Sequence, residues 1–365
     1  DLPQAALAGE LGPVRCRDRE TDRLVATLLR QSKNNPVLVG EAGVGKTAVA
    51  EGFAQRIVRG EVPASLAESR VLALSHLDLI AGSTYRGQFE KRLKGVVDRA
   101  SADPNVILFV DELHNLIGAG TAISQPMDAA NMLKPALTSG RLRVIGATTR
   151  AEYDRWIRPD GALERRFQPI EIEELDDEQT FEVLDARRPR LEAHHLLAIP
   201  DETLRAAIRV AAERMPGRRQ PDRAIDLLDE AAAMLRVRSA TPLADEVRAL
   251  VDERTRLVDE ERSRIDRIAR AGGPSLVARF SYGTFRAFED LGLVMERLFT
   301  GQTTPRGVVP EPESGVVLDE EARRLAEVHA RRLAVDDRLR AALLAAGLTL
   351  TPGDVGQATD EPGRG

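Results

Sequence analysis

One eight-residue stretch of this chain constrains its fold more than any other. It follows a short apolar run at 37–39, the expected end of a buried strand, and precedes a helix-compatible run at 48–58. The stretch fits the pattern G-x-x-x-x-G-K-T, in which loop N–H groups and the N-terminus of the next helix point at phosphate oxygens. The sequence therefore predicts a loop that binds a nucleoside triphosphate, formed by Gly40, Glu41, Ala42, Gly43, Val44, Gly45, Lys46 and Thr47, with Ala48 following in the helix.

A second signature lies at 106–112. Its first five residues are apolar, which is typical of a strand buried on both faces of a parallel sheet, and Asp111 and Glu112 follow at the C-terminal end. Lys46 can reach the β- and γ-phosphates, while Thr47 and Asp111 can hold Mg²⁺. Glu112 can then orient and deprotonate an attacking water. Two solvated acids at a strand end are the plain alternative, and the loop at 40–47 favours the catalytic interpretation.

Two later positions allow a catalytic and a structural interpretation. The strand expected at 142–149 ends in two hydroxyls, and Thr149 can either hold the attacking water or satisfy its own turn. Arg165 and Arg166 follow a helical turn. They fit a surface ion-pair cluster, and they also fit an arginine finger that reaches the nucleotide of a neighbouring subunit.

Composition excludes several classes of protein. The hydrophobic fraction is 42% and the charged fraction 30%, as in globular proteins, and the net charge of −6 argues against a general nucleic-acid surface. Cys16 is the only cysteine, so no intrachain disulfide forms and a reducing compartment is compatible. Neither a signal peptide nor an apolar run of about 18 residues occurs. We expect a cytoplasmic protein with neither nucleic acid nor a membrane as its partner.

The order of these patterns predicts several parts. We expect a flexible lead-in at 1–10, an α/β part at 11–172 and a helical subdomain at 173–240. A charge-dense segment at 241–271 carries Val247, Leu250, Leu257, Ile265 and Ile268 near heptad spacing, which favours either a short coiled coil or a solvated helix packed by one stripe. A helical region of unknown role is expected at 272–351 and a flexible tail at 352–365.

With these motifs in order, residues 11–238 closely resemble the first ATPase module of Clp-type AAA+ unfoldases and disaggregases. The resemblance covers about two thirds of the chain and implies ATP as the nucleotide. It also implies a five-stranded parallel sheet between helices, followed by a small helical lid. The matching segments are 33–47, 85–90, 106–120, 128–137, 146–149, 162–167 and 221–231.

The resemblance also assigns roles to particular residues. Lys46 and Thr47 would contact phosphate and Mg²⁺, and Asp111 and Glu112 would form the metal-binding and water-activating pair. Thr149 would sense the γ-phosphate. The remaining roles would fall to Arg165 and Arg166, acting on the adjacent subunit, to Val14, Arg15 and Cys16 along the adenine, and to Arg223 as a second sensor in the lid.

Tyr85 and Arg86 would belong to a pore loop that grips an unfolded polypeptide. From the residues themselves, Tyr85 lies in the glycine-flanked segment 82–87 of a chain with only 4% aromatics. A Tyr packed against its own helix is the alternative, although Phe89 is better placed for that role.

The chain also departs from the resembling family. No second G-x-x-x-x-G-K-T occurs, there is no room for the family's N-terminal substrate domain, and Ala42 stands where the family usually has Pro. The protease-docking loop of the family belongs to the second module, so nothing supports a Clp peptidase partner.

Two functions of different classes follow from these expectations. The first is a ring-forming, hexameric motor that hydrolyses ATP and threads unfolded or aggregated polypeptide. The second is a scaffold or regulator that assembles with ATP and does not thread. Glu112 and Tyr85 favour the motor, and the missing second module favours the scaffold.

Overall fold

The structure is a computed structural model that describes residues 1–7, 11–75, 86–118, 133, 135–137, 139–238, 245–272 and 312–358. Its centre is a five-stranded sheet in the order β2-β3-β4-β1-β5, with every neighbouring pair parallel. The predicted α/β fold is therefore confirmed. The strands are β1 (Asn35–Val39), β2 (Arg70–Leu74), β3 (Val106–Val110), β4 (Arg143–Thr148) and β5 (Phe167–Glu171).

The register of the central strands explains where the motifs meet. β1 and β3 are buried along their whole length, as their unbroken apolar runs predict. Val39 of β1 pairs with Thr148 of β4, and Val110 of β3 pairs with Gly146. The carboxyl ends of three neighbouring strands therefore lie at one edge, which is where open α/β sheets bind ligands.

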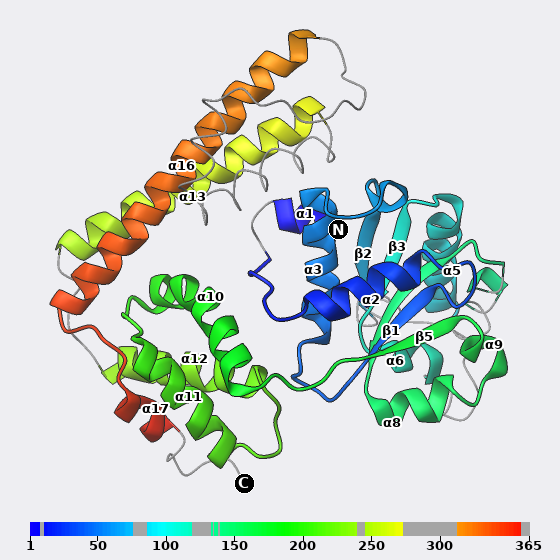
Figure 1. Cartoon of the computed structure of the whole chain (residues 1–365), viewed down its shortest axis with the longest axis horizontal. Coiled ribbons are helices and arrows are strands. Elements are labelled where there is room, and N and C mark those ends of the chain that lie inside the picture. The colour runs from blue at the N-terminus through cyan, green and yellow to red at the C-terminus, as the bar shows by residue number, and fades with distance from the viewer. Residues whose placement is uncertain are drawn as a thin grey trace.

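Helices cover both faces of the sheet (Figure 1). On one face, α2 (Asp18–Leu28) and α3 (Lys46–Arg59) share a core that contains Leu38 and the fully buried Phe53. On the other face, α5 (Arg86–Ala102) and α6 (Leu113–Gly118) contribute Leu93 and Leu113 to a second core. Four short segments complete this part: η1 (Ala64–Leu66), α8 (Arg150–Glu152), the π-helical η2 (Tyr153–Ile157) and α9 (Gly161–Glu164).

The N-terminal lead-in is not flexible where the structure describes it. Residues Leu2–Leu7 form α1, which contacts α3 and β2. Ala6 is buried and Leu2 packs against the same core as Phe53, so the prediction of a flexible segment is wrong for these residues. Their small apolar side chains find a surface that the sequence alone does not reveal.

The helical lid contains four helices in the described part of the chain. They are α10 (Asp177–His195), α11 (Asp201–Arg214), α12 (Asp222–Arg238) and α17 (Pro352–Ala358). The chain returns to the lid at Leu350, whose N–H donates to Ala198 O at 2.9 Å. Val355 of α17 is fully buried in the lid core. Residues 352–358 are therefore not the predicted flexible tail, because their apolar side chains complete that core.

Between α12 and α17 the chain extends into a pair of long helices, α13 (Asp245–Gly272) and α16 (Pro312–Ala345), which lie side by side (Figure 1). The apolar stripe of α13 packs on α16, whose buried residues include Val328, Val335 and Leu339. Helix α13 lies where the charge-dense segment at 241–271 was expected, and it packs on α16 by its apolar stripe. Whether the two helices supercoil as a coiled coil stays a prediction. The stripe residues whose burial the structure describes are Val247, Leu250, Leu257 and Ile265.

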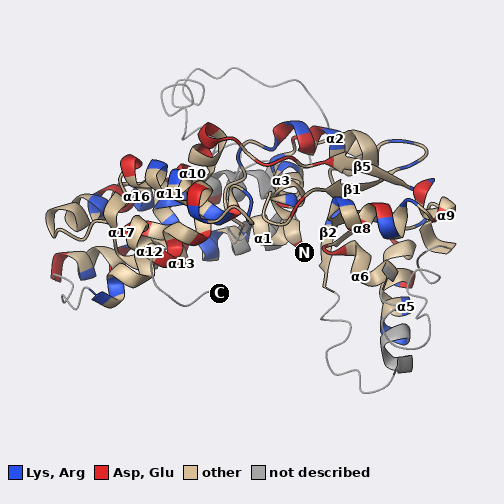
Figure 2. Ribbon diagram, turned by 90° about the horizontal axis from the view of Figure 1, so that it is seen from below, with Lys and Arg blue, Asp and Glu red and all other residues tan. Residues whose placement is uncertain are grey.

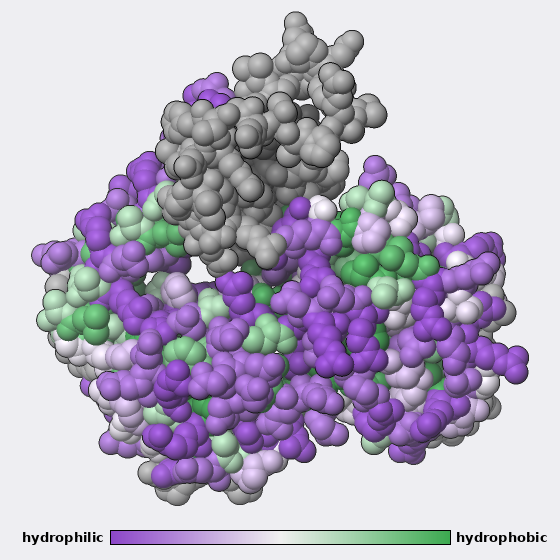
Figure 3. Space-filling model, viewed as in Figure 1, coloured by the Kyte–Doolittle hydropathy of each residue, from purple (hydrophilic) through white to green (hydrophobic). Residues whose placement is uncertain are grey.

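Surface charge is mixed on the described helices. Acidic and basic residues are interspersed along the lid and the long helix pair (Figure 2), and the face shown in Figure 3 is mainly hydrophilic between small apolar areas. None of the described helices has the length and apolar character needed to cross a membrane.

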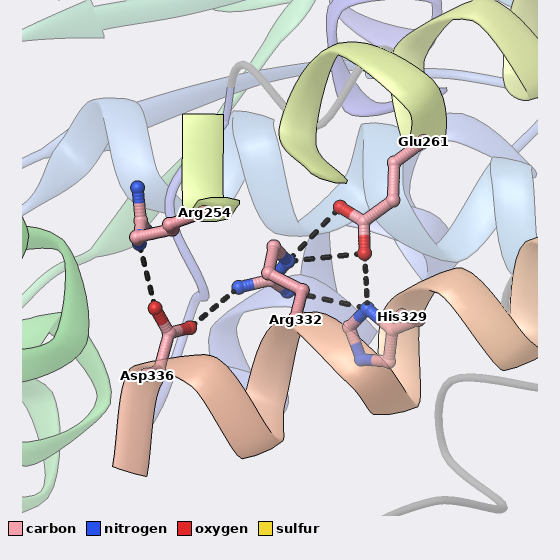
Figure 4. Close-up of polar contacts among 5 residues, drawn as sticks. All are labelled: Arg254, Glu261, His329, Arg332 and Asp336. Carbon is pink, nitrogen blue, oxygen red and sulfur yellow. Dashed lines mark hydrogen bonds and ion pairs between the residues drawn. The ribbon is translucent and has the colours of Figure 1, made fainter. Parts of the chain in front are cut away.

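A part-buried network of polar side chains connects α13 to α16 (Figure 4). Glu261 lies 3.0 Å from His329 Nδ1 and 3.0 Å from Arg332 Nε. Arg332 Nη1 donates a hydrogen bond to Asp336 Oδ2 at 2.9 Å, and Asp336 Oδ1 accepts another from Arg254 Nε at 2.6 Å. Burial alone would raise the pKa of Glu261, but the hydrogen bond from His329 and the charge of Arg332 hold it below its usual value of 4.5. We expect this network to favour the register in which the two helices lie.

Replacing Glu261 tests this connection. Because the folded pKa of Glu261 is lowered, its stabilisation is complete above about pH 4.5 and is lost as the pH falls through the folded pKa. Glu261→Gln should therefore destabilise the pair by about 1–3 kcal/mol at pH 7 and change it little at low pH. Hydrogen exchange of α13 and α16 at both pH values measures this, with the exposed Glu327→Gln as control. Equal protection of Glu261→Gln and the unsubstituted chain at pH 7 would contradict the role.

Candidate nucleotide-binding site

A cavity of about 850 Å³ lies where the sheet edge faces the lid. Its walls come from the loop after β1, the first turns of α3, the ends of β3 and β4, and the lid helices α10 and α12. The sheet supplies a polar end and the lid a more apolar end. The predicted site residues that line the cavity are Val14, Arg15, Ala42, Gly43, Val44, Gly45, Lys46, Thr47, Ala48, Asp111, Glu112 and Thr149.

The loop after β1 has the backbone of an anion cradle. Gly43 and Gly45 have φ values of +83° and +89°, in the left-handed region that side chains with a Cβ disfavour. Gly45 caps α3 without any side-chain hydrogen bond, and no acidic residue lies in the first turn of the helix. The first N–H groups of α3 therefore stay available for an anion, and the helix dipole favours negative charge there.

Lys46, Thr47 and Asp111 supply charge and oxygen ligands beside the cradle. Lys46 Nζ donates to the carbonyl oxygens of Gly40 and Glu41 at 3.0 and 2.9 Å, and burial lowers its pKa. Thr47 Oγ1 donates to Asp111 Oδ2 at 3.0 Å. A hydroxyl beside a carboxylate is the kind of oxygen pair that Mg²⁺ takes together with substrate phosphates. The residues present therefore fit a triphosphate with Mg²⁺.

Glu112 lines the cavity beside Asp111 and has a strained backbone conformation. Its φ is +50°, which costs a residue with a Cβ energy and is often found at functional sites. Its Oε2 accepts a hydrogen bond from Asn115 Nδ2 at 2.8 Å. The carboxylate is thus held next to Asp111, whose Oδ1 accepts from the backbone N–H of Glu112 at 2.9 Å.

A polar network joins the turn after β3 to the end of β4. His114 Nδ1 lies 3.1 Å from Thr148 Oγ1, and His114 Nε2 lies 2.9 Å from Glu152 Oε1. Thr149 donates to Glu152 Oε2 at 2.8 Å and caps α8, so it makes the turn contact while also lining the cavity. Burial would raise the pKa of Glu152, but the hydrogen bonds from Thr149 and the nearby His114 lower it.

The segment before α2 forms one wall of the cavity. Arg17 is buried, and its Nη2 donates to Val44 O at 2.6 Å and to Glu173 O at 2.9 Å, which fixes the segment to the phosphate loop. Val14 and Arg15 line the cavity as predicted. Cys16 does not: its Sγ lies 3.1 Å from Glu182 Oε2 in α10. Burial, with Glu182 beside it, raises the pKa of the thiol to about 12, so the thiolate is disfavoured.

Arg223 is also absent from the cavity wall. Its Nη2 pairs with Glu174 at 3.1 Å and its Nη1 donates to Arg218 O at 3.2 Å. The structure therefore does not bring Arg223 to the nucleotide, because Glu174 takes up its charge. The lid arginine on the cavity wall is Arg187 of α10.

The remaining predicted residues lie elsewhere. Arg165 and Arg166 follow α9, and neither lines the cavity of its own chain. Tyr85 lies outside the described residues, and Arg86 begins α5 with its side chain outside the described part.

Sequence reasoning did not identify several cavity residues. His114 lies two positions after Glu112, and that spacing was the one available signal. Pro221, Asp222 and Ile225 lie in the matching segment 221–231, whereas Leu175, Val183 and Arg187 gave no signal, because more than a hundred positions separate them from the phosphate loop. The cavity residues missed are Pro13, Arg17, Glu51, Ala73, Leu74, Ser75, Phe109, His114, Asn115, Thr148, Glu152, Leu175, Val183, Arg187, Pro221, Asp222 and Ile225.

The sheet order, the phosphate loop and the adjacent acidic pair define a P-loop nucleotide-binding module with a helical lid. Comparison with known families agrees: residues 36–173 match the ATPase family associated with various cellular activities (AAA), and residues 176–271 match the AAA lid domain. The chain belongs to the Clp-type AAA+ ATPase family. Family membership implies nucleotide binding.

Individual relatives support the same assignment. The chain is 49% identical over 249 residues to the chaperone protein ClpB of Aquifex aeolicus, covering 68% of this chain and 25% of that protein. It is 52% identical over 241 residues to the Clp protease ATP-binding subunit ClpC of Staphylococcus epidermidis, covering 66% and 29%. The chain thus spans between a quarter and a third of these relatives.

A solved structure of the S. cerevisiae Hsp104:casein complex in an extended conformation is also similar. It has a TM-score of 0.60 and 36% sequence identity, and the match covers 76% of this chain and 52% of that chain. The likeness therefore extends beyond the sequence match to the arrangement of the sheet and the lid.

Glu112→Gln tests the assignment of the polar end. The amide keeps the shape of the side chain but removes the base, so nucleotide should still bind while hydrolysis falls by about 10² to 10⁴. Phosphate release under saturating ATP and binding of a fluorescent nucleotide measure the two separately. Asn115→Ala, which removes only the hydrogen bond to the carboxylate, is the matched control and should retain most activity. Unchanged turnover in Glu112→Gln would exclude Glu112 as the base.

Proposed function

We propose that this chain is the ATP-hydrolysing module of a protein-remodelling motor. The observation that carries the proposal is the Asp111–Glu112 pair, set beside Thr47 at the end of a phosphate cradle. Its relatives ClpB and ClpC bear the names of a chaperone and of an ATP-binding subunit of a protease. The proposed site of action is the cytoplasm.

The residues divide the work of hydrolysis. Lys46 leaves the carbonyl oxygens of Gly40 and Glu41 and donates to the terminal phosphates of ATP. Thr47 and Asp111 are the residues that would hold Mg²⁺, which would supply positive charge to the phosphates when bound. Glu112 takes the proton of the attacking water, and the Glu152-bound hydroxyl of Thr149 stabilises the end of β4 beside it.

Assembly completes the site in this proposal. Neither Arg165 nor Arg166 lines the cavity of its own chain, and Arg165 is exposed. Both belong to the short stretch between α9 and β5, where a neighbouring subunit of a ring can meet them. The proposed assembly is a homohexamer in which each subunit supplies these arginines to the next.

Polypeptide is the proposed substrate, gripped by Tyr85 and Arg86. The flat ring of Tyr85 contacts side chains without reading sequence, and Arg86 donates to backbone carbonyl oxygens. Support comes from the similar structure, which is an Hsp104:casein complex.

The arginines give a test of action between subunits. Arg165→Ala and Arg166→Ala should each lower hydrolysis, because an arginine finger supplied in trans contributes about 10³ to 10⁵ in rate. Each variant is then mixed with Glu112→Gln protein over a series of ratios. Activity should depend non-linearly on the ratio, since a subunit with an intact base can receive an intact arginine. Mixtures no more active than the weighted sum of the two variants measured alone would contradict the trans role.

Tyr85→Ala separates the motor from the scaffold. Basal hydrolysis and assembly should be retained, while stimulation of hydrolysis by unfolded casein and binding of casein should be lost. Tyr153→Phe, at a buried tyrosine away from the cavity wall, is the control. If the unsubstituted chain neither binds casein nor is stimulated by it, the motor proposal fails and nucleotide-dependent assembly replaces it. Stimulation that survives in Tyr85→Ala would exclude this residue as the grip.

A further inference from the structure

The lid presents an arginine to the nucleoside end of the cavity. Arg187 lies on α10 and lines the cavity together with Val183 of the same helix. Its Nε is buried and has no hydrogen-bond partner within the described residues. A buried donor without a partner is costly, and native structures usually satisfy such groups with protein, water or a ligand.

The position of Arg187 relative to the phosphate loop follows from its charged neighbours. Burial raises the pKa of Glu51 and of Asp222, and the positive charge of Arg187 opposes that rise in both carboxyl groups. Glu51 is on α3, roughly 7 Å along the helix from Lys46 at 1.5 Å per residue. Asp222 begins α12, and its N–H donates to Gly43 O at 3.4 Å. Arg187 lines the same cavity as these two carboxyl groups, one on α3 and one at the start of α12.

The surrounding wall is suited to a nucleoside. A Cβ on Gly52 would lie 3.2 Å from Val14 Cγ1, so Val14 covers the second turn of α3 next to Glu51. The lid adds apolar atoms from Leu175, Val183 and Ile225. Flat apolar walls with a few polar groups are the usual lining of a small-molecule site.

We propose that Arg187 is the lid's contact to the nucleoside of the bound nucleotide. A guanidinium only donates hydrogen bonds, so its partners are the acceptor atoms of a nucleoside, the ring nitrogens of the base or the ribose oxygens. Glu51, opposite it, accepts from the amino group or the hydroxyls. The nucleotide then joins α3 to α10, which links occupancy of the site to the position of the lid. The proposal rests on nucleotide binding by this module and needs neither hydrolysis nor threading.

Affinity for two nucleotides distinguishes this role from a phosphate sensor. We would measure binding of ADP and of the non-hydrolysable analogue AMP-PNP to the full chain by calorimetry. Arg187→Leu should weaken both by the same factor, roughly tenfold, because both carry the same nucleoside. Arg187→Lys keeps a charge but loses the planar fork, and should give a smaller, equal loss for both. Arg209→Leu, an exposed arginine of α11, is the control and should bind like the unsubstituted chain.

Two results would overturn the proposal. One is unchanged affinity for both nucleotides in Arg187→Leu, and the other is a loss confined to AMP-PNP, which would place Arg187 on the γ-phosphate. Thermal unfolding without nucleotide checks the fold, and Arg187→Lys decides the question if the leucine variant is unfolded. Failure of the unsubstituted chain to bind ADP would instead contradict the proposed function itself.

Discussion

Free N–H groups at the start of α3 are the feature on which the rest of this structure depends. They point at an anion only if β1 stops at the sheet edge and the chain turns at once into the helix. The left-handed glycines at 43 and 45 allow that turn. β4 lies next to β1 and β3 next to β4, so the carboxyl ends of these strands bring Thr149, Asp111 and Glu112 to the same edge as the loop after β1. The sheet order is therefore a condition for the site as well as for the fold.

The lid is the second requirement, and its construction is less local. Its core is closed by Leu350 and Val355, which return to it after the long excursion of α13 and α16. Thr203 Oγ1 donates to Leu350 O at 2.8 Å, so the returning chain also satisfies a buried hydroxyl of α11. The long helix pair is thus inserted into the lid and is attached to it at both ends. The pair therefore shares its core with Leu184 of α10.

The phosphate end of the site could be predicted from sequence, because its parts are contiguous and each has a chemical requirement. Gly43, Gly45 and Lys46 stand at fixed spacing, and Asp111 follows a run that has to be a buried strand. The five-stranded parallel sheet followed from the family resemblance and is confirmed.

The nucleoside end could not be predicted in the same way. Its walls depend on how the lid packs on α3, and sequence spacing does not encode that contact. Cys16 faces α10 instead of the cavity, and Arg223 is taken up by Glu174. The segments 2–7 and 352–358 form helices where flexible ends were expected, because tertiary packing stabilises helices that are too short to be stable alone.

The central claim is that one nucleotide is held by the sheet edge and the lid together. Hydrogen exchange measured with and without AMP-PNP and Mg²⁺ tests it most directly. The account predicts slower exchange in the loop and first turn of α3, residues 43–48, and also in the facing parts of α10 and α12, with α13 and α16 far less affected. Protection confined to the loop, with the lid exchanging as in the nucleotide-free chain, would contradict it.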